Sequence, residues 1–413
     1  MRAQEVVVVS DCAMRHLRLL LGLCLAAASA TAGQASDLSP VISVGIFSGH
    51  DVSACSITGQ AAITLENERG RRLSEFPGGT RLEVEAEGGL VVVRCEAPRG
   101  QGQSRRYVLS SPEPITVQPE GLTARSYRGQ VALVERDGRL VLVNRAGIED
   151  YLRGVLPSEI PAGFQPEALR AQAIVARTYA VATRNRHERD GYDLCDRSHC
   201  QVFLGTERED ARLDAAIEDT AGLILTYEGE PIHAVYHAVC GGRTAANETA
   251  WPGTRPLPYL RPVSDSNGDG AWCETAPGAA WTRSITQSQL ATVLAPFGVG
   301  APISSIEPAA RDSGGRPREF ILHGAHGEYR VSSSELRSVM NRALGGDTLP
   351  SADFDAAPNG EMMVFAGRGY GHGVGLCQWG ANAIAAAGSM AEEVLQHYYP
   401  GATIAPMSGE AAR

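Results

Sequence analysis

Residues 151–182 read YLRGVLPSEIPAGFQPEALRAQAIVARTYAVA, and this stretch decides how the chain is organised around one carboxylate. Its first half sets Glu159 between Pro157 and Pro161. Proline and the small residues that follow are typical of turns, so the pattern predicts that Glu159 lies in a turn. The question that the sequence raises is whether this carboxylate is a catalyst.

A helix is predicted to follow that turn. Pro166 suits a first helical turn, where its missing N–H would have no partner, and the carboxylate of Glu167 suits the positive end of the helix dipole. One leucine and three alanines recur on one face at helical spacing: Leu169, Ala173, Ala176 and Ala180. Small side chains allow a close approach of neighbouring backbones, so this helix is predicted to be a packing platform.

The sequence before this stretch is typical of β-strands. Between residues 41 and 145, runs such as VISVGIF and VALVERDGRLVLVNRAG mix β-branched residues with alternating polarity. Asp137-Gly138 separates two apolar runs, which predicts a tight hairpin. Cys55 and Cys95 lie in this β-rich N-terminal region and are candidates for a disulfide, although spacing alone does not show that their strands meet.

The sequence after the stretch predicts a mixed core that is interrupted by a lobe. Residues 146–280 carry helices and short strands, and residues 356–405 contain a glycine-rich loop that enters a helix near Gln378. Between them, residues 281–355 predict helix, strand, strand and helix, which indicates a small inserted α/β lobe. We therefore expect an α+β fold with a mixed β-sheet core, a β-rich N-terminal part and a central small-residue helix.

Composition excludes several classes of function. The chain has 413 residues, of which 43% are hydrophobic and 20% charged, so it can bury a full core. Its formal charge of -10 argues against non-specific binding to nucleic acid, whose phosphates repel an acidic surface. All 37 basic residues are arginine, which removes Schiff-base and Walker-type lysine chemistry.

The N-terminus has the pattern of an export signal. A basic segment at Arg15–Arg18 precedes an apolar run from Leu19 to Ala28, so residues 1–32 are predicted to be a signal peptide. The run is too short to span a bilayer, and we expect no membrane span after signal removal. The protein is therefore expected in the periplasm or cell envelope. Loss of Cys12 and Cys24 leaves seven of nine cysteines, an odd number that requires a free, metal-bound or intermolecular thiol.

One loop is dense in metal ligands. Two imidazoles and two thiols follow the pattern H-x7-C-x3-H-C: His187, Cys195, His199 and Cys200. Such a set completes a closed tetrahedral zinc site, which would be structural rather than catalytic. The competing interpretation is a disulfide between the two cysteines, which an oxidising compartment favours. For the first ligand, His233 and His237 are alternatives to His187.

A glycine-rich segment is a candidate wall of a binding cleft. Residues 369–375 read GYGHGVG, and glycines of this kind allow a backbone to approach a sugar or a phosphate closely. His372 and Gln378 could bind hydroxyl groups there. The alternative is that His372 is an ordinary core residue on a tight turn.

A second glycine-containing segment, residues 240–244, reads CGGRT and follows Tyr236-His237. We expect a turn beside the same cleft. Cys240 is expected near Cys273 or Cys377, either of which would be its disulfide partner. His237 could equally be a core residue.

Taken together, these segments resemble one family. The matching pieces are EDYLRGVLPSEIP with EALRAQAIVARTYA, then YDLCDRSHCQVFLG, YHAVCGGRT with the later Trp251, and GRGYGHGVGLCQWGA. They occur in the family's order over roughly residues 145–385. In these segments the chain resembles the stage II sporulation protein D / LytB family of exported cell-wall proteins. It departs from many members at Cys377, where they carry Ser or another small residue.

The resemblance implies an activity. Sporulation-type members are lytic transglycosylases that cleave the MurNAc-GlcNAc bond of peptidoglycan, with the glutamate of the GVxPxE segment as acid, here Glu159. One carboxyl group suffices, because it protonates the glycosidic oxygen and its carboxylate then deprotonates the muramic C6 hydroxyl, which closes a 1,6-anhydro ring. Apolar neighbours would raise its pKa by desolvation: Leu156, Ile160 and Phe164. A helix-capping or ion-paired surface glutamate is the structural alternative.

The resemblance also supplies the remaining expectations. Substrate contacts are assigned to six side chains: Gln172, Arg177, Tyr179, Tyr236, His372 and Gln378. Some members bind zinc through a similar His and Cys cluster, and no organic cofactor is expected. The expected partners are peptidoglycan glycan strands and a cell-wall amidase, without nucleic acid. The alternatives are a non-catalytic wall-binding protein or amidase modifier of the LytB kind, and a glycan hydrolase.

Overall fold

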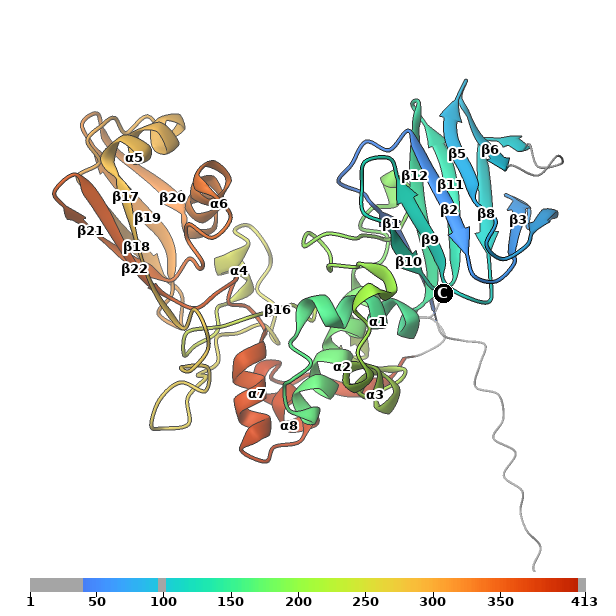
Figure 1. Ribbon diagram of the computed structural model, residues 1–413. Helices are drawn as coiled ribbons and strands as arrows, with labels where there is room; N and C mark the ends of the chain where they lie inside the picture. Colours follow the sequence, from blue (N-terminus) through green and yellow to red (C-terminus); the bar gives the residue numbers. More distant parts are fainter. Residues whose placement is uncertain (1–39, 96–101, 408–413) are drawn as a thin grey trace, which may run out of the picture. The chain divides into compact units, whose positions relative to one another are not determined.

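The computed structural model describes residues 40–95 and 102–407. Within these ranges the protein has the expected α+β fold, with several sheets and a β-rich N-terminal part (Figure 1). None of the helices in the described part is both long and apolar enough to cross a membrane. The expected signal peptide, residues 1–32, lies outside the described residues.

Two sheets form a sandwich in the N-terminal region. Their strands are β1 (Val41–Ile46), β2 (Ala54–Gly59), β3 (Ile63–Asn67), β4 (Arg72–Phe76), β5 (Leu82–Glu87), β6 (Leu90–Cys95), β7 (Gly102–Ser104), β8 (Arg106–Ser110), β9 (Ile115–Pro119), β10 (Arg125–Tyr127), β11 (Gln130–Arg136), β12 (Arg139–Gly147) and β13 (Leu194–Cys195). One sheet has the order β13-β1-β12-β11-β8-β3-β4 and the other β10-β9-β2-β5-β6-β7. Alternate side chains such as Leu133 and Ile57 point inward from the two sheets and share one apolar core.

The predicted hairpin at Asp137-Gly138 is confirmed. These two residues connect β11 to β12, and Arg136 pairs with Arg139 across the turn. Both turn residues have positive φ, 53° and 79°, as a two-residue turn of type I′ requires.

The strands that carry Cys55 and Cys95 do not meet. Cys55 lies on β2 and Cys95 on β6, and β5 runs between them. Strands two apart in a sheet are separated by about 9–10 Å. That spacing exceeds the Cα separation of about 7 Å that a disulfide tolerates, so a disulfide between these two candidate residues is ruled out.

The helix that follows β12 corrects the expectation for Glu159. Helix α1 (Ile148–Glu159) continues through Pro157 and ends at Glu159, where the N–H of Ile160 donates to the carbonyl of Leu156 at 3.0 Å. A proline in the last turn removes one helical hydrogen bond, and the turn nevertheless closes. Glu159 is therefore the final residue of a helix and not part of a turn.

Helix α2 (Pro166–Ala182) begins with Pro166 in its first turn, as predicted. It packs against several elements: β14 (Leu223–Tyr227), α1, α3 (Ala211–Asp219), α7 (Gln378–Ala386) and α8 (Ala391–Tyr398). The small-residue face is confirmed, since its four side chains are at most 1% exposed: Leu169, Ala173, Ala176 and Ala180. These small side chains let several elements approach α2, which lies among them in Figure 1.

Short pairings complete the core around α2. Strand β14 pairs with β15 (Glu230–Pro231) and with β24 (Thr403–Pro406). Strand β16 (Tyr236–His237) runs parallel to β23 (Leu376–Cys377), which ends where α7 begins. The remaining short helices are Glu188–Asp190, Gly205–Arg208, α4 (Asn247–Ala250) and Ala295–Phe297.

The sandwich and the first helices share one core. A single cluster of buried apolar side chains runs from Ile42 in β1 to Ala180 in α2 and beyond. Residue 145, the expected boundary of the N-terminal region, therefore lies inside β12 and does not separate two cores.

The inserted lobe has its own apolar core. It comprises β17 (Ala280–Thr286), α5 (Gln287–Leu294), β18 (Ser305–Arg311), β19 (Pro317–Gly324), β20 (Gly327–Ser332), α6 (Ser333–Leu344), β21 (Phe354–Asn359) and β22 (Met362–Arg368). Buried side chains from Trp281 to Phe365 form this core. Strand β22 lies between β17 and β21, so residue 355, the expected end of the lobe, falls inside β21.

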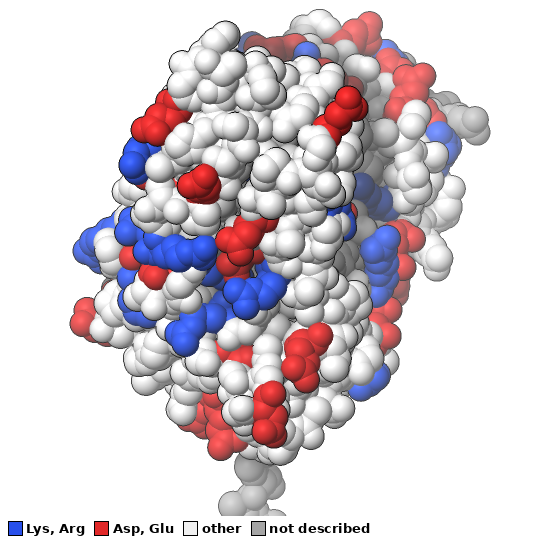
Figure 2. All heavy atoms as spheres, turned by 90° about the vertical axis from the view of Figure 1, so that its left-hand side faces the viewer, with Lys and Arg blue, Asp and Glu red and all other residues white. Residues whose placement is uncertain are grey.

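Charge on one face of the molecule is mixed. Figure 2 shows basic and acidic side chains in contact there, surrounded by a larger area that carries neither. Ion pairs such as Arg330 with Glu319 and Arg311 with Asp355 occur on the strands of the lobe. Opposite charges are therefore balanced locally in this part of the surface.

Candidate active site

A cavity of about 730 Å³ lies at the C-terminal end of α1. Its wall comes from α1, α2, the loop that follows α2, the segment around β16, α4 with the residues after it, and the glycine-rich loop. Four of the side chains expected to act on substrate line it: Glu159, Tyr179, Tyr236 and His372. Three others do not line it: Gln172, Arg177 and Gln378.

Glu159 presents a half-buried carboxylate to this cavity. Its Oε1 accepts a 2.8 Å hydrogen bond from the backbone N–H of Val202, and the hydroxyl of Tyr236 also hydrogen-bonds to the carboxylate. Burial raises the pKa of Glu159, and these two hydrogen bonds offset part of that rise. The net shift is upward, so Glu159 holds its proton to a higher pH than an ordinary glutamate does.

The surroundings of Glu159 contradict the alternative of a surface ion pair. Three apolar neighbours named from the sequence are themselves buried: Leu156, Ile160 and Phe164. Within the described ranges, Glu159 forms no ion pair with a basic side chain. Desolvation is therefore the dominant influence on this carboxyl group.

A chain of hydrogen bonds leads from Glu159 into the core. Gln201 donates from Nε2 to the hydroxyl of Tyr236 at 3.1 Å, and its Oε1 accepts from the hydroxyl of Tyr151 on α1 at 3.1 Å. Because the Tyr236 oxygen accepts from Gln201, its own proton is directed toward Glu159. Gln201 and Tyr151 are fully buried, so this chain fixes the carboxylate from inside the protein.

The first residue of α7 holds Glu159 through its backbone. Gln378 donates from Nε2 to the carbonyl of Glu159 at 2.9 Å and to Oε1 of Gln172 at 3.3 Å. Gln172 and Gln378 are 0% and 6% exposed. Their positions correct the expectation that they contact substrate, because they join α1, α2 and α7 within the core.

Arg177 is also structural. Its guanidinium is fully buried, pairs with Glu149 in the first turn of α1 at 2.6 Å, and donates to the carbonyls of Leu223 at 3.0 Å and Ile217 at 3.3 Å. The expectation that Arg177 binds substrate is wrong, since its donors are occupied outside the cavity. It joins α1, α2, α3 and β14, and loss of one partner from such a buried pair costs about 3–5 kcal/mol.

Two basic side chains line the cavity. Arg186 donates to the hydroxyl of Tyr179 at 2.9 Å, and the ring of Tyr179 lies edge-on to that of Tyr236. Arg255 lines the cavity from the segment after α4. Neither arginine is paired with a carboxylate in the described part of the chain. An anionic group of a ligand would therefore meet uncompensated positive charge here.

His372 and Trp251 line the cavity with an imidazole and an indole. The two ring centres are 5.1 Å apart, and Trp251 is 38% exposed. Nδ1 of His372 accepts from the N–H of Val374 at 3.1 Å, and burial lowers the pKa of His372 to about 4. His372 is therefore neutral at neutral pH. An exposed aromatic face beside a neutral imidazole suits a sugar ring with hydroxyl groups.

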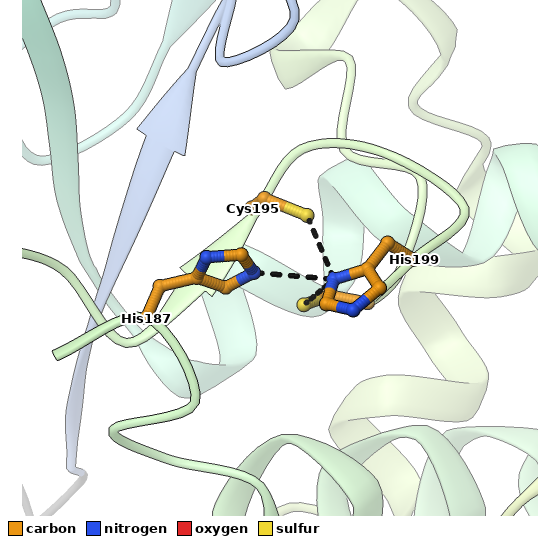
Figure 3. A group of neighbouring side chains, drawn as sticks. His187, Cys195 and His199 are labelled. Atoms are coloured by element: carbon orange, nitrogen blue, oxygen red, sulfur yellow. Dashed lines mark hydrogen bonds between the residues drawn. The ribbon is translucent and has the colours of Figure 1, made fainter. Parts of the chain in front are cut away.

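The His and Cys loop forms a compact set of donor atoms, which we call the cavity-wall cluster: His187, Cys195, His199 and Cys200. One donor atom from each residue lies within 4.8 Å of all the others. Nδ1 of His199 is 3.2 Å from Nε2 of His187, 3.7 Å from Sγ of Cys195 and 3.6 Å from Sγ of Cys200. Figure 3 shows His187 and Cys195 directed toward the His199 ring.

The donor set of the cavity-wall cluster fits a metal ion. Nδ1 of His187 is 2.8 Å from Oδ2 of Asp190, which leaves Nε2 to face the other donors. A carboxylate behind a histidine in this way is typical of metal sites. Cys195 and Cys200 are thiols, and the two alternative histidines, His233 and His237, lie outside the cluster.

The loop that carries the cavity-wall cluster is fixed to the sandwich. Strand β13 pairs in parallel with β1, and the flanking Asp193 and Asp196 accept hydrogen bonds from β1 and the residues after it. The two residues that follow Cys200 are those that hold Glu159 and Tyr236, namely Val202 through its N–H and Gln201 through its amide. The cluster therefore lies next to the contacts that position the carboxylate.

Sequence reasoning missed several residues of the site. Gln201 and the Val202 amide are adjacent to the predicted ligand Cys200, which was the available signal. Arg186 and Arg255 carried no signal beyond their charge. Cys240 lies near Cys273, as expected, but their Sγ atoms are 3.5 Å apart and form no disulfide.

Comparison with known proteins gives consistent matches. The model of the stage II sporulation protein family, SpoIID, matches residues 136–227, which include Glu159 and the cavity-wall cluster. An uncharacterized protein of Brachyspira hyodysenteriae is 30% identical over 286 residues, which cover 68% of this chain and 73% of that protein.

Two named relatives are similar over comparable lengths. The stage II sporulation protein D of Bacillus amyloliquefaciens is 30% identical over 281 residues, 63% of this chain and 75% of that protein. The amidase enhancer of Bacillus subtilis is 28% identical over 297 residues, 61% of this chain and 40% of that protein.

Proposed function

The chain belongs to the stage II sporulation protein D family, and we propose that it is an exported lytic transglycosylase that cleaves the MurNAc-GlcNAc bonds of peptidoglycan glycan strands. Glu159 acts first as acid and then as base, and the products end in 1,6-anhydroMurNAc. One observation carries this proposal: the wall of a large cavity contains a carboxyl group whose pKa is raised by burial.

In the first step, protonated Glu159 donates its proton to the glycosidic oxygen. The bond from that oxygen to C1 of MurNAc breaks, GlcNAc leaves with a hydroxyl group, and positive charge develops at C1. The N–H of Val202 and the hydroxyl of Tyr236 hold the carboxyl group and stabilise the carboxylate that forms.

In the second step, the carboxylate of Glu159 takes the proton of the C6 hydroxyl of MurNAc. The C6 oxygen bonds to C1, the anhydro ring closes, and Glu159 is protonated again. The reaction consumes no water and requires no second carboxylate. This chemistry fits the site, because Glu159 is the one acidic side chain among the described residues that line the cavity. A hydrolase would need a second carboxylate about 5–9.5 Å away.

Substrate binding is assigned to the rest of the cavity wall. Trp251 stacks on a sugar ring, and His372 and Tyr179 bind hydroxyl groups. Arg186 and Arg255 bind the lactyl carboxylate of MurNAc, which is free only where the stem peptide has been removed. The two arginines therefore favour glycan strands without stem peptides.

We also propose that the cavity-wall cluster holds Zn²⁺ through His187, Cys195, His199 and Cys200. Zn²⁺ is structural here, because four protein ligands fill its coordination shell. The ion would hold the loop in place, and two residues of that loop, Gln201 and Val202, position Glu159 through hydrogen bonds. Metal analysis of the purified protein tests this proposal against His199→Ala, and a protein that lacks zinc and has a Cys195–Cys200 disulfide would contradict it.

The test of the proposed reaction is digestion of purified glycan strands by the mature protein, with mass analysis of the products. The wild-type protein releases fragments with anhydroMurNAc ends. Glu159→Gln keeps the shape of the side chain but cannot transfer a proton, so the rate falls by about 10³-fold or more. Glu392→Gln, an exposed residue of α8, is the matched control and leaves the rate unchanged. Undiminished release by Glu159→Gln removes the catalytic role.

The similarity to an amidase enhancer supports one alternative, a non-catalytic protein that binds the wall and modifies an amidase. Under this alternative the wild-type protein releases no sugar but stimulates a cell-wall amidase, and the Glu159→Gln variant stimulates the amidase to the same extent. Reducing ends in place of anhydro ends would instead indicate a hydrolase.

A further inference from the structure

A second group of metal-ligating side chains lies in the core, outside the function proposed above. Three thiols and one carboxylate meet there: Cys240, Asp265, Cys273 and Cys377. Their sulfurs and one carboxylate oxygen all lie within 4.8 Å of one another, and each residue is at most 1% exposed. We call this group the buried cluster.

Three segments that are distant in sequence deliver these side chains. Cys240 follows β16, and Cys377 ends the neighbouring β23 just before α7. Asp265 and Cys273 come from the irregular segment between α4 and β17. The buried cluster thus lies where the irregular segment between α4 and β17 packs against the β16–β23 pair.

The donor atoms lie at, or slightly inside, the separations found around a single tetrahedral ion. Sγ of Cys240 is 3.5 Å from Sγ of Cys273 and 3.0 Å from Oδ2 of Asp265. An ion bonded tetrahedrally to sulfur at about 2.3 Å and to oxygen at about 2.0 Å separates such atoms by about 3.5–3.8 Å. A disulfide would bring two sulfurs to about 2.05 Å. The four side chains can therefore surround one ion with only small adjustments.

Backbone amides point at the sulfurs of the cluster. The N–H of Cys240 donates to Sγ of Cys377 at 3.2 Å, that of Gly242 donates to Sγ of Cys240 at 3.3 Å, and that of Gly380 donates to Sγ of Cys377 at 3.4 Å. Such donors stabilise negative charge on sulfur. The backbone is thus arranged for thiolates, the form in which cysteine binds a metal.

The carboxylate of Asp265 is oriented by a second residue. The hydroxyl of Tyr398 donates to its Oδ1 at 2.5 Å, which leaves Oδ2 directed at Cys240. A side chain at Gly380 would collide with both the tyrosine hydroxyl and the carboxylate, so glycine is required for this approach. Ligating carboxylates are commonly held by such a hydrogen bond on the other oxygen.

A fully buried carboxylate beside three thiols needs positive charge. Within the described residues, the one basic group paired with Asp265 is His397, whose Nε2 is 3.8 Å from Oδ1 and makes no hydrogen bond. No arginine pairs with Asp265 in that part of the chain. A bound divalent cation would supply the missing charge.

We propose that Cys240, Asp265, Cys273 and Cys377 bind one Zn²⁺ ion in a closed structural site. Thiolate-rich tetrahedral sets favour Zn²⁺, and a site without an open position has no place for water or substrate. The ion joins the irregular segment and β16 to the start of α7. There Gln378 holds the backbone of Glu159, so the ion fixes one side of the cavity without touching its contents.

The test is the number of metal ions per chain in the full mature protein, purified without chelator. With the cavity-wall and buried clusters both filled, the wild-type protein holds two zinc ions. Cys377→Ser removes one of them, as does the milder Asp265→Asn, and His199→Ala removes the other independently. Cys55→Ser, a buried thiol of the sandwich, is the matched control and retains both ions.

Cobalt provides a readout that does not depend on damaging the buried cluster. In His199→Ala exchanged with Co²⁺, the remaining ion shows the strong thiolate-to-metal absorption of a sulfur-rich tetrahedral site. A wild-type protein whose only ion is lost in His199→Ala overturns the proposal, as does a Cys240–Cys273 disulfide found by peptide mapping. Because no substrate enters these measurements, their outcome is independent of the proposed reaction.

Discussion

The two clusters of candidate metal ligands differ in their origin in the chain, in their donor types and in their exposure. The cavity-wall cluster comes from one loop, contains two imidazoles and has an exposed member, His199. The buried cluster comes from three segments, contains three thiols and has no exposed member. Each nevertheless precedes a glutamine that positions Glu159: Gln201 follows Cys200, and Gln378 follows Cys377.

This comparison shows how one carboxylate is fixed from two directions. Gln201 reaches Glu159 through the hydroxyl of Tyr236, and therefore acts on the side chain. Gln378 binds the carbonyl of Glu159, and therefore acts on the backbone. A local loop controls the first contact, and an assembly of distant segments controls the second.

The largest effect is expected when the carboxyl group itself is moved. Glu159→Asp withdraws it by one methylene from the Val202 amide and Tyr236, and we expect kcat on glycan strands to fall by about 10²–10³-fold with little change in KM. Initial rates of anhydro-end release measure this, with Glu392→Asp as control. If both clusters act by positioning Glu159, the loss of kcat in Glu159→Asp must exceed that of any variant in the clusters. A near-normal kcat for Glu159→Asp would contradict positioning of Glu159 as the shared role of the clusters.

A smaller effect is expected when each glutamine is shortened. Gln378→Ala should lower kcat by about 10–100-fold, because it loosens the hold on the backbone of Glu159, and Gln201→Ala by less than about tenfold, because Gln201 reaches Glu159 only through the hydroxyl of Tyr236. Gln396→Ala, an exposed glutamine of α8, is the matched control. The double variant tests whether the two glutamines act independently. If they do, its fold loss in kcat equals the product of the two single losses. A loss no larger than that of one single variant indicates that both glutamines act through one contact.

Metal release should distinguish the clusters by exposure. A chelator should remove the ion of the cavity-wall cluster at least about tenfold faster than that of the buried cluster, whose release requires local unfolding. Zinc released over time, monitored with a colorimetric indicator, measures both phases. Release of both ions in a single phase would show that the difference in exposure does not govern access.

The smallest effect concerns pH. Glu159 must be protonated to act as acid, so kcat/KM falls as pH rises through its raised pKa. The hydrogen bond from Tyr236 lowers that pKa, so Tyr236→Phe should move the alkaline limb of the profile to higher pH, with a rate loss below about tenfold. A shift to lower pH would contradict the assignment of Tyr236 as a stabiliser of the carboxylate.

The sequence predicted the features that neighbouring residues determine. The turn at Asp137-Gly138 and the start of α2 at Pro166 depend on local backbone preferences, and both are confirmed. The expected location of Glu159 in a turn is wrong, because α1 continues through Pro157 to Glu159 although this proline cannot donate a helical hydrogen bond.

Contacts between distant segments could not be predicted. Arginine is a common ligand-binding residue, so the sequence allowed that role for Arg177. Its burial in an ion pair becomes visible only when α1 packs beside α2 and brings Glu149 to it. Cys240 was expected near another cysteine, but nothing local indicated that Asp265 would join it. Local patterns therefore indicated which segments carry candidate side chains, but the contacts that join those segments, such as Gln201 with Tyr236, were not predicted.

The pairing of β13 with β1 limits how this protein can be divided. Residues 136–227, which match the family model, contain the loop of the cavity-wall cluster but not the strand beside which that loop lies. A fragment cut to the match would expose the edge of β12 and leave Asp193 and Asp196 without their partners. The smallest portable unit for a chimera therefore starts at β1, and exchanging the loop between relatives requires exchanging that strand with it.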